Sequence, residues 1–241
     1  GDLGESLAAR RPVSDLVADR LQNTLLLALA ALVVLTPLSL LLGVLAAARA
    51  GRIVDAAISG TSLAVVSVPE FVIGTLLVLV FAVSFGALPS VSLVAPGSTP
   101  LLQPEILVLP TAALVLAGLA YMTRIVRAGM VEALGAEYIE MARLNGVLER
   151  RVVLRHALRN ALGPSVQALA LTIQWLIGGV VVIEVLFAYP GLGEILVNGV
   201  RSRDVTLVQS AGLIVAAAVV LVNALADLVV VLLVPRLRTA S

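Results

Sequence analysis

The run LQNTLLLALAALVVLTPLSLLLGVLAAA occupies residues 21–48 and contains no charged side chain. A helix of this length rises about 40 Å at about 1.5 Å per residue, which is enough to cross a hydrocarbon layer of about 30 Å with some tilt. The run therefore predicts a membrane-spanning α-helix.

The composition of the whole chain supports this prediction. Of its 241 residues, 60% are hydrophobic and 13% are charged, and the mean hydropathy is +1.11. Soluble proteins carry about 25% charged residues, so an ordinary soluble enzyme is excluded. The chain has no cysteine, which excludes disulfides and thiolate metal sites. All 16 basic residues are arginine, so the chain lacks the phosphate-binding lysine of a P-loop ATPase.

Four further apolar stretches predict four further spans, which lie within residues 57–86, 106–127, 163–187 and 205–234. In the second of the five spans, Pro69 and Glu70 interrupt the apolar run, and this predicts a kink or a break at Ser67–Glu70. None of the stretches alternates with a period of two, which argues against a β-barrel. The sequence therefore predicts an all-α polytopic membrane protein whose transmembrane domain covers residues 21–234.

The placement of arginine predicts the orientation of the spans. Arginines gather in the loop between the first two spans, in the loop between the third and fourth, and in the tail 235–241. These three segments are predicted to face the cytoplasm, and the segment 1–20 to lie outside it or at the membrane interface. That segment is polar, lacks an initiator Met and has no span before it, so we expect at least one further transmembrane helix upstream.

The longest charged stretch, residues 132–160, joins the third and fourth spans. Glu137 and Glu140 lie near the start of a predicted short helix, where the helix dipole favours acidic side chains. Gly146 can end this helix, because glycine adopts positive φ without strain. The small residues Ala142 and Gly146 permit the close approach of another surface. From these residues alone, two interpretations are open. The stretch either docks onto another protein, or it is a solvated cytoplasmic loop that is rich in arginine because of the positive-inside rule.

Within this loop, Glu140-Met-Ala142 followed after three residues by Gly146 resembles the E-A-A-x-x-x-G loop of the permease subunits of ABC importers. The wider run 137–162 resembles the oligopeptide/dipeptide/nickel branch of that family. Met141 departs from the family pattern, since it replaces the second letter of the motif.

Three other stretches resemble the same branch. They are GDLGES at residues 1–6, FAYPGLG at 187–193, and the close of the chain from Asp227 to Arg236. The resemblance thus extends over the whole chain in order. Gly163 stands where the family usually has leucine, and the family's first helix and extracellular insertion are absent.

The resemblance implies a type I ABC importer permease core, of the B-type subunit, whose cytoplasmic EAA loop forms a coupling helix. In this family the coupling helix docks onto a cytoplasmic ATPase subunit, which binds ATP and Mg²⁺ itself, so no cofactor and no catalytic residue are expected on this chain. The positions that match the docking segment are Glu137, Tyr138, Glu140, Ala142, Arg143, Gly146, Arg150 and Arg151.

The resemblance also implies the partners of the chain. They are a second, related permease in a heterodimer, two cytoplasmic ATPase subunits or domains, and an extracytoplasmic substrate-binding protein, all at a bacterial inner membrane. The implied substrates are dipeptides or oligopeptides, or a related small solute such as a nickel chelate or glutathione. The formal net charge of +1 gives no sign of a nucleic-acid partner.

Two groups of residues are candidates for lining or gating the pathway. In the first group, Glu70 follows Pro69 at the predicted break, where it either lines the pathway or bonds the backbone groups that the break leaves free. The second group opens the loop before the last span, which either dips into the pathway, contacts the binding protein, or forms a structural turn. This second group is Tyr189, Pro190, Gly191 and Gly193.

An ion-coupled secondary transporter is the alternative function. Such a protein would use intramembrane acids such as Glu70 and Asp227. The single histidine, His156, has no second ligand at metal-binding spacing, so no metal site is predicted. Copurification with an ATPase subunit distinguishes the importer from the secondary transporter.

Overall fold

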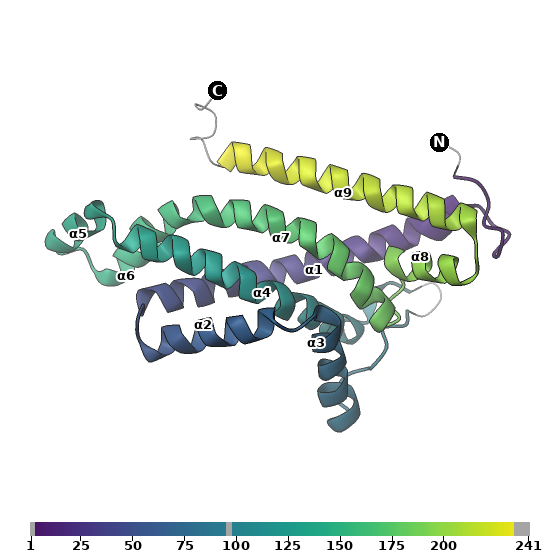
Figure 1. Ribbon diagram of the computed structural model, residues 1–241, viewed down its shortest axis with the longest axis horizontal. Coiled ribbons are helices and arrows are strands. Elements are labelled where there is room, and N and C mark those ends of the chain that lie inside the picture. Colours follow the sequence, from purple (N-terminus) through teal and green to yellow (C-terminus); the bar gives the residue numbers. More distant parts are fainter. Residues whose placement is uncertain (1–2, 95–97, 234–241) are drawn as a thin grey trace. The chain divides into compact units, whose positions relative to one another are not determined.

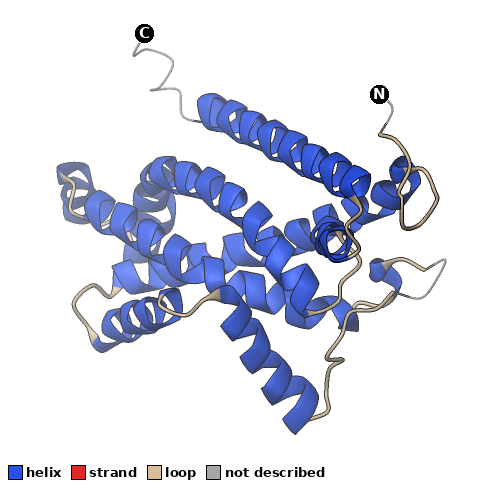
Figure 2. Ribbon diagram, turned by 45° about the vertical axis from the view of Figure 1, so that its right-hand side comes forward, coloured by secondary structure: helices blue, strands red, loops and turns tan. Residues whose placement is uncertain are grey.

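The computed structural model describes residues 3–94 and 98–233, and in these residues it consists of helices and connecting loops (Figures 1 and 2). In chain order the helices are α1 (Val13–Ala48), α2 (Ile53–Val66), α3 (Glu70–Leu77), η1 (Val78–Ser84), η2 (Pro100–Leu102), α4 (Glu105–Leu134), α5 (Glu137–Leu144), α6 (Glu149–Arg151), η3 (Val152–Ala157), α7 (Leu158–Leu186), α8 (Leu192–Arg201) and α9 (Val205–Leu233). The expected tail, 235–241, lies outside the described residues.

The number of helices that could cross a membrane agrees with the predicted fold class. Within the described residues, four helices are long and apolar enough, namely α1, α4, and parts of α7 and α9. The bent pair formed by α2 with α3 and η1 gives a fifth. The predicted break is present, because α2 ends at Val66 and α3 begins at Glu70. Pro69 precedes α3 at its N-cap, where the N–H that proline lacks is not needed.

Several helices extend beyond the predicted spans. The first begins at Val13 instead of residue 21, the third ends at Leu134 instead of residue 127, and the fourth begins at Leu158 instead of residue 163. Runs without charge mark only the part of a helix that suits lipid, whereas the helix itself continues wherever packing supports it. Val13 and Val17, for example, are almost fully buried although charged residues lie beside them.

The chain divides into two compact units, each with its own buried cluster. The first unit comprises Gly1–Leu32, Pro69–Val115 and Gln174–Asn223, and the second comprises Val33–Val68, Leu116–Ile173 and Ala224–Ser241. In the first unit, the cluster that we call the α8 core is Val13, Val17, Leu192, Ile195 and Leu207. In the second unit, the cluster that we call the α5 core is Ala47, Val126, Met130, Ala133, Ile139, Val152, Val153, Ala157 and Ala161.

Candidate coupling surface and the Glu184 cluster

The short helix α5 forms where the charge pattern predicts it. Glu137 and Glu140 lie in its first turn and Arg143 in its last, so the charges complement the helix dipole at both ends. The helix has only 8 residues, and a helix this short is not stable in water by itself. Its stability therefore depends on how its ends are bonded and on what it packs against.

The end of α5 is a Schellman motif built on Gly146. Gly146 has a φ of +76°, and its N–H donates to the carbonyl of Arg143 at 2.9 Å. The N–H of Val147 donates to the carbonyl of Ala142 at 3.1 Å. Ala142 and Val147 both pack against the α5 core, which supplies the apolar contact that accompanies this motif. The glycine of the EAA pattern is therefore needed for its backbone conformation.

One side of α5 is held by Ile139. This side chain is fully buried in the α5 core, where α4 contributes Met130 and Ala133, and η3 contributes Val152. The opposite side is open, since Tyr138, Met141 and Leu144 are 43%, 59% and 77% exposed. We call these three residues, together with Leu148, which is 75% exposed, the coupling surface. Figure 1 shows α5 and α6 next to each other beyond the end of α4.

The residues expected to dock onto an ATPase lie mostly on the exposed side of this segment. The half-buried Ala142 is the one that packs inward. The exposed ones are Glu137, Tyr138, Glu140, Arg143, Gly146, Arg150 and Arg151. The structure therefore brings these positions onto one short surface segment, while their role in docking stays a prediction.

Two side-chain contacts brace the loop, and sequence reasoning identified neither. The guanidinium of Arg143 donates two hydrogen bonds to the carboxylate of Glu149, at 3.0 and 2.7 Å, across the Gly146 turn. The hydrogen bonds from Arg143 hold the pKa of Glu149 below its usual value. The amide of Asn160 donates to the hydroxyl of Tyr138 at 2.7 Å and links α5 to the start of α7. Both contacts are exposed, so they position the loop more than they stabilise the fold.

The predicted turn at Tyr189 follows a second Schellman motif, at the end of α7. Ala188 has a φ of +49°, and the N–H of Tyr189 donates to the carbonyl of Glu184 at 2.8 Å. The Tyr189 side chain is fully buried, and its hydroxyl donates to the carbonyl of Asn23 at 2.9 Å. The amide of Asn23 in turn donates to the carbonyl of Pro190 at 2.9 Å. Burial, with the Glu184 carboxylate nearby, raises the pKa of Tyr189, so its hydroxyl stays protonated.

The carboxylate of Glu184 lies at the centre of this turn. It is fully buried and accepts hydrogen bonds from the hydroxyl of Thr24 and from the N–H of Gly193, each at 2.6 Å. The Thr24 hydroxyl also accepts a hydrogen bond from the N–H of Leu192 at 2.8 Å. This arrangement, which we call the Glu184 cluster, joins α1 and the end of α7 to the start of α8. A buried carboxylate is tolerated only where donors satisfy it in this way.

The glycines of the turn make room for this carboxylate. A Cβ atom on Gly191 would overlap the carboxylate of Glu184. A Cβ atom on Gly193 would lie 2.6 Å from the Cα atom of Val181 and 2.9 Å from the carboxylate of Glu184. Gly191 and Gly193 are thus surrounded by other residues of this chain. The sequence analysis did not connect Glu184 with the turn.

The other pathway candidates lie at the break between α2 and α3. Pro69 is exposed, and Glu70 is half-buried in the first turn of α3. The carbonyl of Pro69 accepts hydrogen bonds from Val72 and Ile73, which closes the first turn. A role for Pro69 or Glu70 in the pathway stays a prediction. Across residues 3–94 and 98–233, no three histidine or acidic side chains come together as metal ligands would.

Asp204 joins the start of the chain to the start of α9. One carboxylate oxygen caps α9 by accepting a hydrogen bond from the N–H of Leu207 at 3.1 Å. The other accepts hydrogen bonds from the hydroxyl of Ser6 at 2.5 Å and from the N–H of Ala8 at 3.1 Å. The hydrogen bond from Ser6, aided by those from backbone N–H groups, lowers the pKa of Asp204 to about 2.

The pKa of Asp204 predicts how its contribution to stability depends on pH. An unfolded aspartate has a pKa of about 3.9, so the charged form stabilises the fold above that value and the stabilisation is lost as pH falls toward the folded pKa of about 2. We expect an Asp204→Asn variant to unfold at a lower temperature than the natural chain, by an amount constant from pH 8 to pH 5. The difference should shrink only below about pH 4. Thermal unfolding in detergent measures this, and a difference that disappears between pH 7 and pH 5 would contradict the assignment.

These features define a class of protein: a polytopic helical membrane protein that exposes a short, braced helix outside its apolar spans. Two solved transporter structures share the fold. A crystal structure of an amino acid ABC transporter with histidines superposes with a TM-score of 0.69, at 17% identity, over 89% of this chain and 92% of that one. The methionine ABC transporter MetNI in an inward-facing conformation gives a TM-score of 0.63, at 19% identity, over 89% and 93%.

Sequence comparison places the chain in a family. The family model described as "Binding-protein-dependent transport system inner membrane component" matches residues 39–239, and the chain belongs to this family. It is 38% identical to a putative peptide transport system permease protein of Brucella abortus (strain 2308), over 98% of this chain and 76% of the relative. It is 36% identical to the oligopeptide transport system permease protein AppB of Bacillus subtilis (strain 168), over 99% and 76%. It is 35% identical to the glutathione transport system permease protein GsiC of Escherichia coli (strain K12), over 99% and 75%.

Family membership confirms the resemblance inferred from the EAA pattern. The chain is a membrane-bound permease subunit of an ABC importer, a system that also contains ATPase subunits and a substrate-binding protein. The ion-coupled secondary transporter is not favoured, because the relatives are permease components of binding-protein-dependent systems.

Proposed function

We propose that this chain forms one half of the translocation pathway for short peptides. The names of its relatives support this substrate class, since they describe permeases for peptide, oligopeptide and glutathione transport. A second, related permease forms the other half, because five or six helices from one chain are few for a closed pathway. ATP and Mg²⁺ bind to the ATPase partners, since this chain has no lysine with which to build a P-loop.

The observation that carries the proposal is the two-sided character of α5. Its buried side packs into the α5 core through Ile139, while Tyr138, Met141 and Leu144 are exposed between charged residues. Because Glu137, Glu140 and Arg143 share this short helix, it lies in water and not in lipid. Large apolar side chains that are grouped together and exposed in water mark a protein interface. We infer that the coupling surface docks onto the ATPase subunit and carries its motion to the membrane helices.

The orientation of the chain follows from the same proposal. The ATPase is cytoplasmic, so α5 and the arginine-rich loop around it face the cytoplasm, in agreement with the positive-inside rule. The tail 235–241 then lies on the cytoplasmic side as well, and the turn that contains Tyr189 and Gly191 lies on the outside. Labelling of intact cells tests this orientation: a probe that cannot cross the membrane should react at position 198 changed to cysteine and not at position 141.

A charge in the coupling surface is expected to weaken docking strongly. Met141→Glu places a carboxylate where the proposed interface excludes water, and we expect a loss of about 2 kcal/mol in binding, or roughly thirtyfold. Uptake of a labelled dipeptide by cells that carry only this variant should fall by at least about tenfold, and less ATPase subunit should copurify. Leu102→Glu is the matched control, since Leu102 is 74% exposed in η2, far along the chain from α5. Equal uptake by both variants would contradict the docking role.

The substrate class has its own test. Cells that lack the gene for this chain should lose uptake of labelled dipeptides and tripeptides, and the natural gene should restore it. Unlabelled peptides should compete for that uptake, whereas free amino acids should not. Restoration of amino acid uptake alone would overturn the assignment to peptides and leave the membership of the family intact.

A further inference from the structure

The first turn of α2 is held to α4 by an ion pair. The guanidinium of Arg127 meets the carboxylate of Asp55 in a two-pronged arrangement, with Nε 2.5 Å from Oδ1 and Nη2 2.7 Å from Oδ2. The Asp55 side chain is 7% exposed and that of Arg127 is 32% exposed. A pair of parallel hydrogen bonds fixes the relative orientation of its two groups, which a single contact does not.

The same carboxylate also holds the turn that precedes α2. The N–H of Gly51, a residue with a φ of +76°, donates to Oδ2 of Asp55 at 2.9 Å, and the hydroxyl of Ser59 donates to Oδ1 at 3.2 Å. Both oxygens of Asp55 are therefore engaged by more than one donor. The ion pair consequently connects Arg127 with the whole start of α2 and not with one side chain.

The stretch of α4 that bears Arg127 also contacts the coupling helix. Val126 and Met130, one residue before Arg127 and three after it, are fully buried in the α5 core together with Ile139 of α5. A displacement of α5 is transmitted to α4 through this packing, because a close-packed cluster has little room to deform. From α4 it reaches α2 through Arg127 and Asp55.

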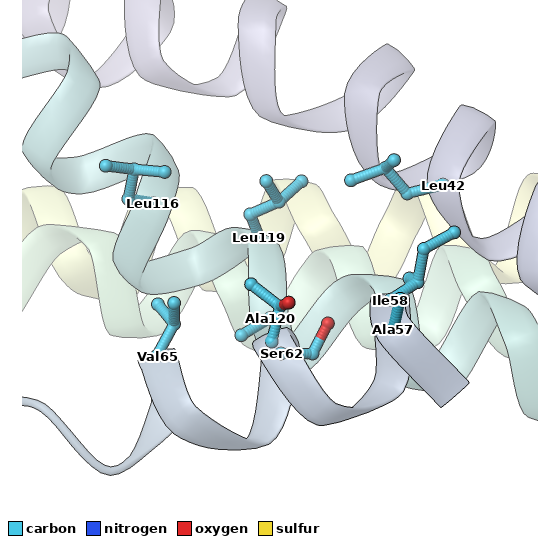
Figure 3. A pocket seen from close by; sticks show the side chains of 9 residues that line it. Leu42, Ala57, Ile58, Ser62, Val65, Leu116, Leu119 and Ala120 are labelled. Atoms are coloured by element: carbon cyan, nitrogen blue, oxygen red, sulfur yellow. The ribbon is translucent and has the colours of Figure 1, made fainter. Parts of the chain in front are cut away.

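Beyond its first turns, α2 is separated from α4 by a cavity. This cavity has a volume of about 280 Å³ and lies between α2, α4 and Leu42 of α1 (Figure 3). Side chains of α2 line one wall, among them Ile58, Ser62 and Val65, and Leu119 and Ala120 of α4 line another. The cavity is open to the surface, since Ala57 and Thr61 in its α2 wall are exposed. α2 is thus fastened to α4 at its start and loosely packed against it farther along.

We propose that the Asp55–Arg127 ion pair is a hinge through which α4 moves α2, and that the cavity is the space through which α2 swings. Asp55 and Arg127 are then positioning residues that act on the pathway through α2. This inference rests on the proposed function, because it assumes that the coupling surface receives motion from the ATPase. It is distinguished from a purely stabilising role by the readout, since loss of a pair that only stabilises the fold would lower the unfolding temperature without a selective loss of stimulation by the binding protein.

The test uses the complete importer in proteoliposomes, with ATP hydrolysis measured with and without peptide-loaded binding protein. For Arg127→Met, which keeps an apolar stem and removes the charge, we expect a lower unfolding temperature, because Asp55 loses its ionic partner, but unchanged basal hydrolysis in the complexes that assemble. Stimulation by the binding protein and peptide uptake per ATP should each fall by at least about fivefold. Arg127→Lys, which keeps the charge and loses the two-pronged geometry, should recover part of the stimulation. Arg124→Met is the matched control, because Arg124 lies on the same helix and is exposed.

Equal stimulation in the Arg127→Met and Arg124→Met variants would overturn the hinge. If the natural importer is stimulated normally by the binding protein but imports no peptide, the proposed substrate is overturned. The hinge is then left intact, because it is measured from the stimulation of ATP hydrolysis.

A second variant tests the cavity without touching the ion pair. Ala120→Leu fills part of the space between α4 and α2, so we expect an unchanged or higher unfolding temperature together with a loss of at least about fivefold in uptake. Ser62→Ala, which keeps the space open, is the control and should transport normally. Normal uptake by a stable Ala120→Leu complex would overturn the proposed movement of α2.

Discussion

A Gly191→Ala variant is expected to be markedly less stable than the natural chain. Gly191 is buried, and the added Cβ atom would overlap the carboxylate of Glu184. Overpacking of this kind costs about 1–3 kcal/mol, and moving the buried carboxylate away from Thr24 and Gly193 costs about as much again. A total of about 3 kcal/mol or more is a large part of the stability of a typical domain. We expect the unfolding temperature in detergent to fall by about 10 °C.

Two further variants separate this collision from a general effect of alanine. Gly178 lies in α7, six residues before Glu184, and a Cβ atom there would meet nothing within 4 Å. Gly178→Ala should therefore be neutral or stabilise the helix by about 0.5–1 kcal/mol. In a Glu184→Ala background, where the carboxylate is absent, adding Gly191→Ala should cost less than about 1 kcal/mol. If the costs of the two substitutions simply added, the collision with Glu184 would not be the cause.

The helices of this fold could be predicted from the sequence because the lipid bilayer restricts which residues a membrane-crossing segment can contain. A segment that crosses a hydrocarbon layer cannot carry many charges, so uncharged runs such as 21–48 locate the spans directly. The break at Pro69 follows from the missing N–H of proline. The ends of the helices depend on packing instead. α1 begins at Val13 because Val13 and Val17 contact Ile195 and other members of the α8 core, which lie far along the chain.

Some residues of the candidate site could likewise be predicted from the sequence, and others could not. Gly146 was predictable, since a helix that ends in a Schellman motif needs positive φ at that position and the required bonds are local. Asp55, Glu184 and Asp204 were not, because their partners lie far away in sequence: Asp204, for example, bonds Ser6 across nearly the whole chain. A single sequence contains no local pattern that pairs such residues. The glycines at 191 and 193 looked like parts of a turn, and only the fold shows that they accommodate a carboxylate.

An Ile139→Asp variant is expected to abolish peptide uptake while the chain still inserts into the membrane. Ile139 is fully buried in the α5 core, and it is the side chain that holds the 8-residue helix α5 against α4. A carboxylate without a partner in that cluster costs several kcal/mol, which exceeds what so short a helix gains from its own hydrogen bonds. α5 should therefore detach and unfold, and the coupling surface should be lost as a unit. The spans should still insert into the membrane, because Ile139 lies outside them.

Uptake and proteolysis together test this expectation. We expect uptake to fall at least about twentyfold and trypsin to cleave after Arg143 and Arg150 much faster than in the natural chain, since unfolding exposes the backbone to protease. Ile139→Val is the control, because it costs only about 0.5–1.5 kcal/mol and keeps the apolar contact. Faster cleavage with normal uptake would mean that transport does not require an ordered α5. The motion would then have to enter the membrane helices elsewhere, and the inferred path from α5 through Arg127 to α2 would lose its starting point.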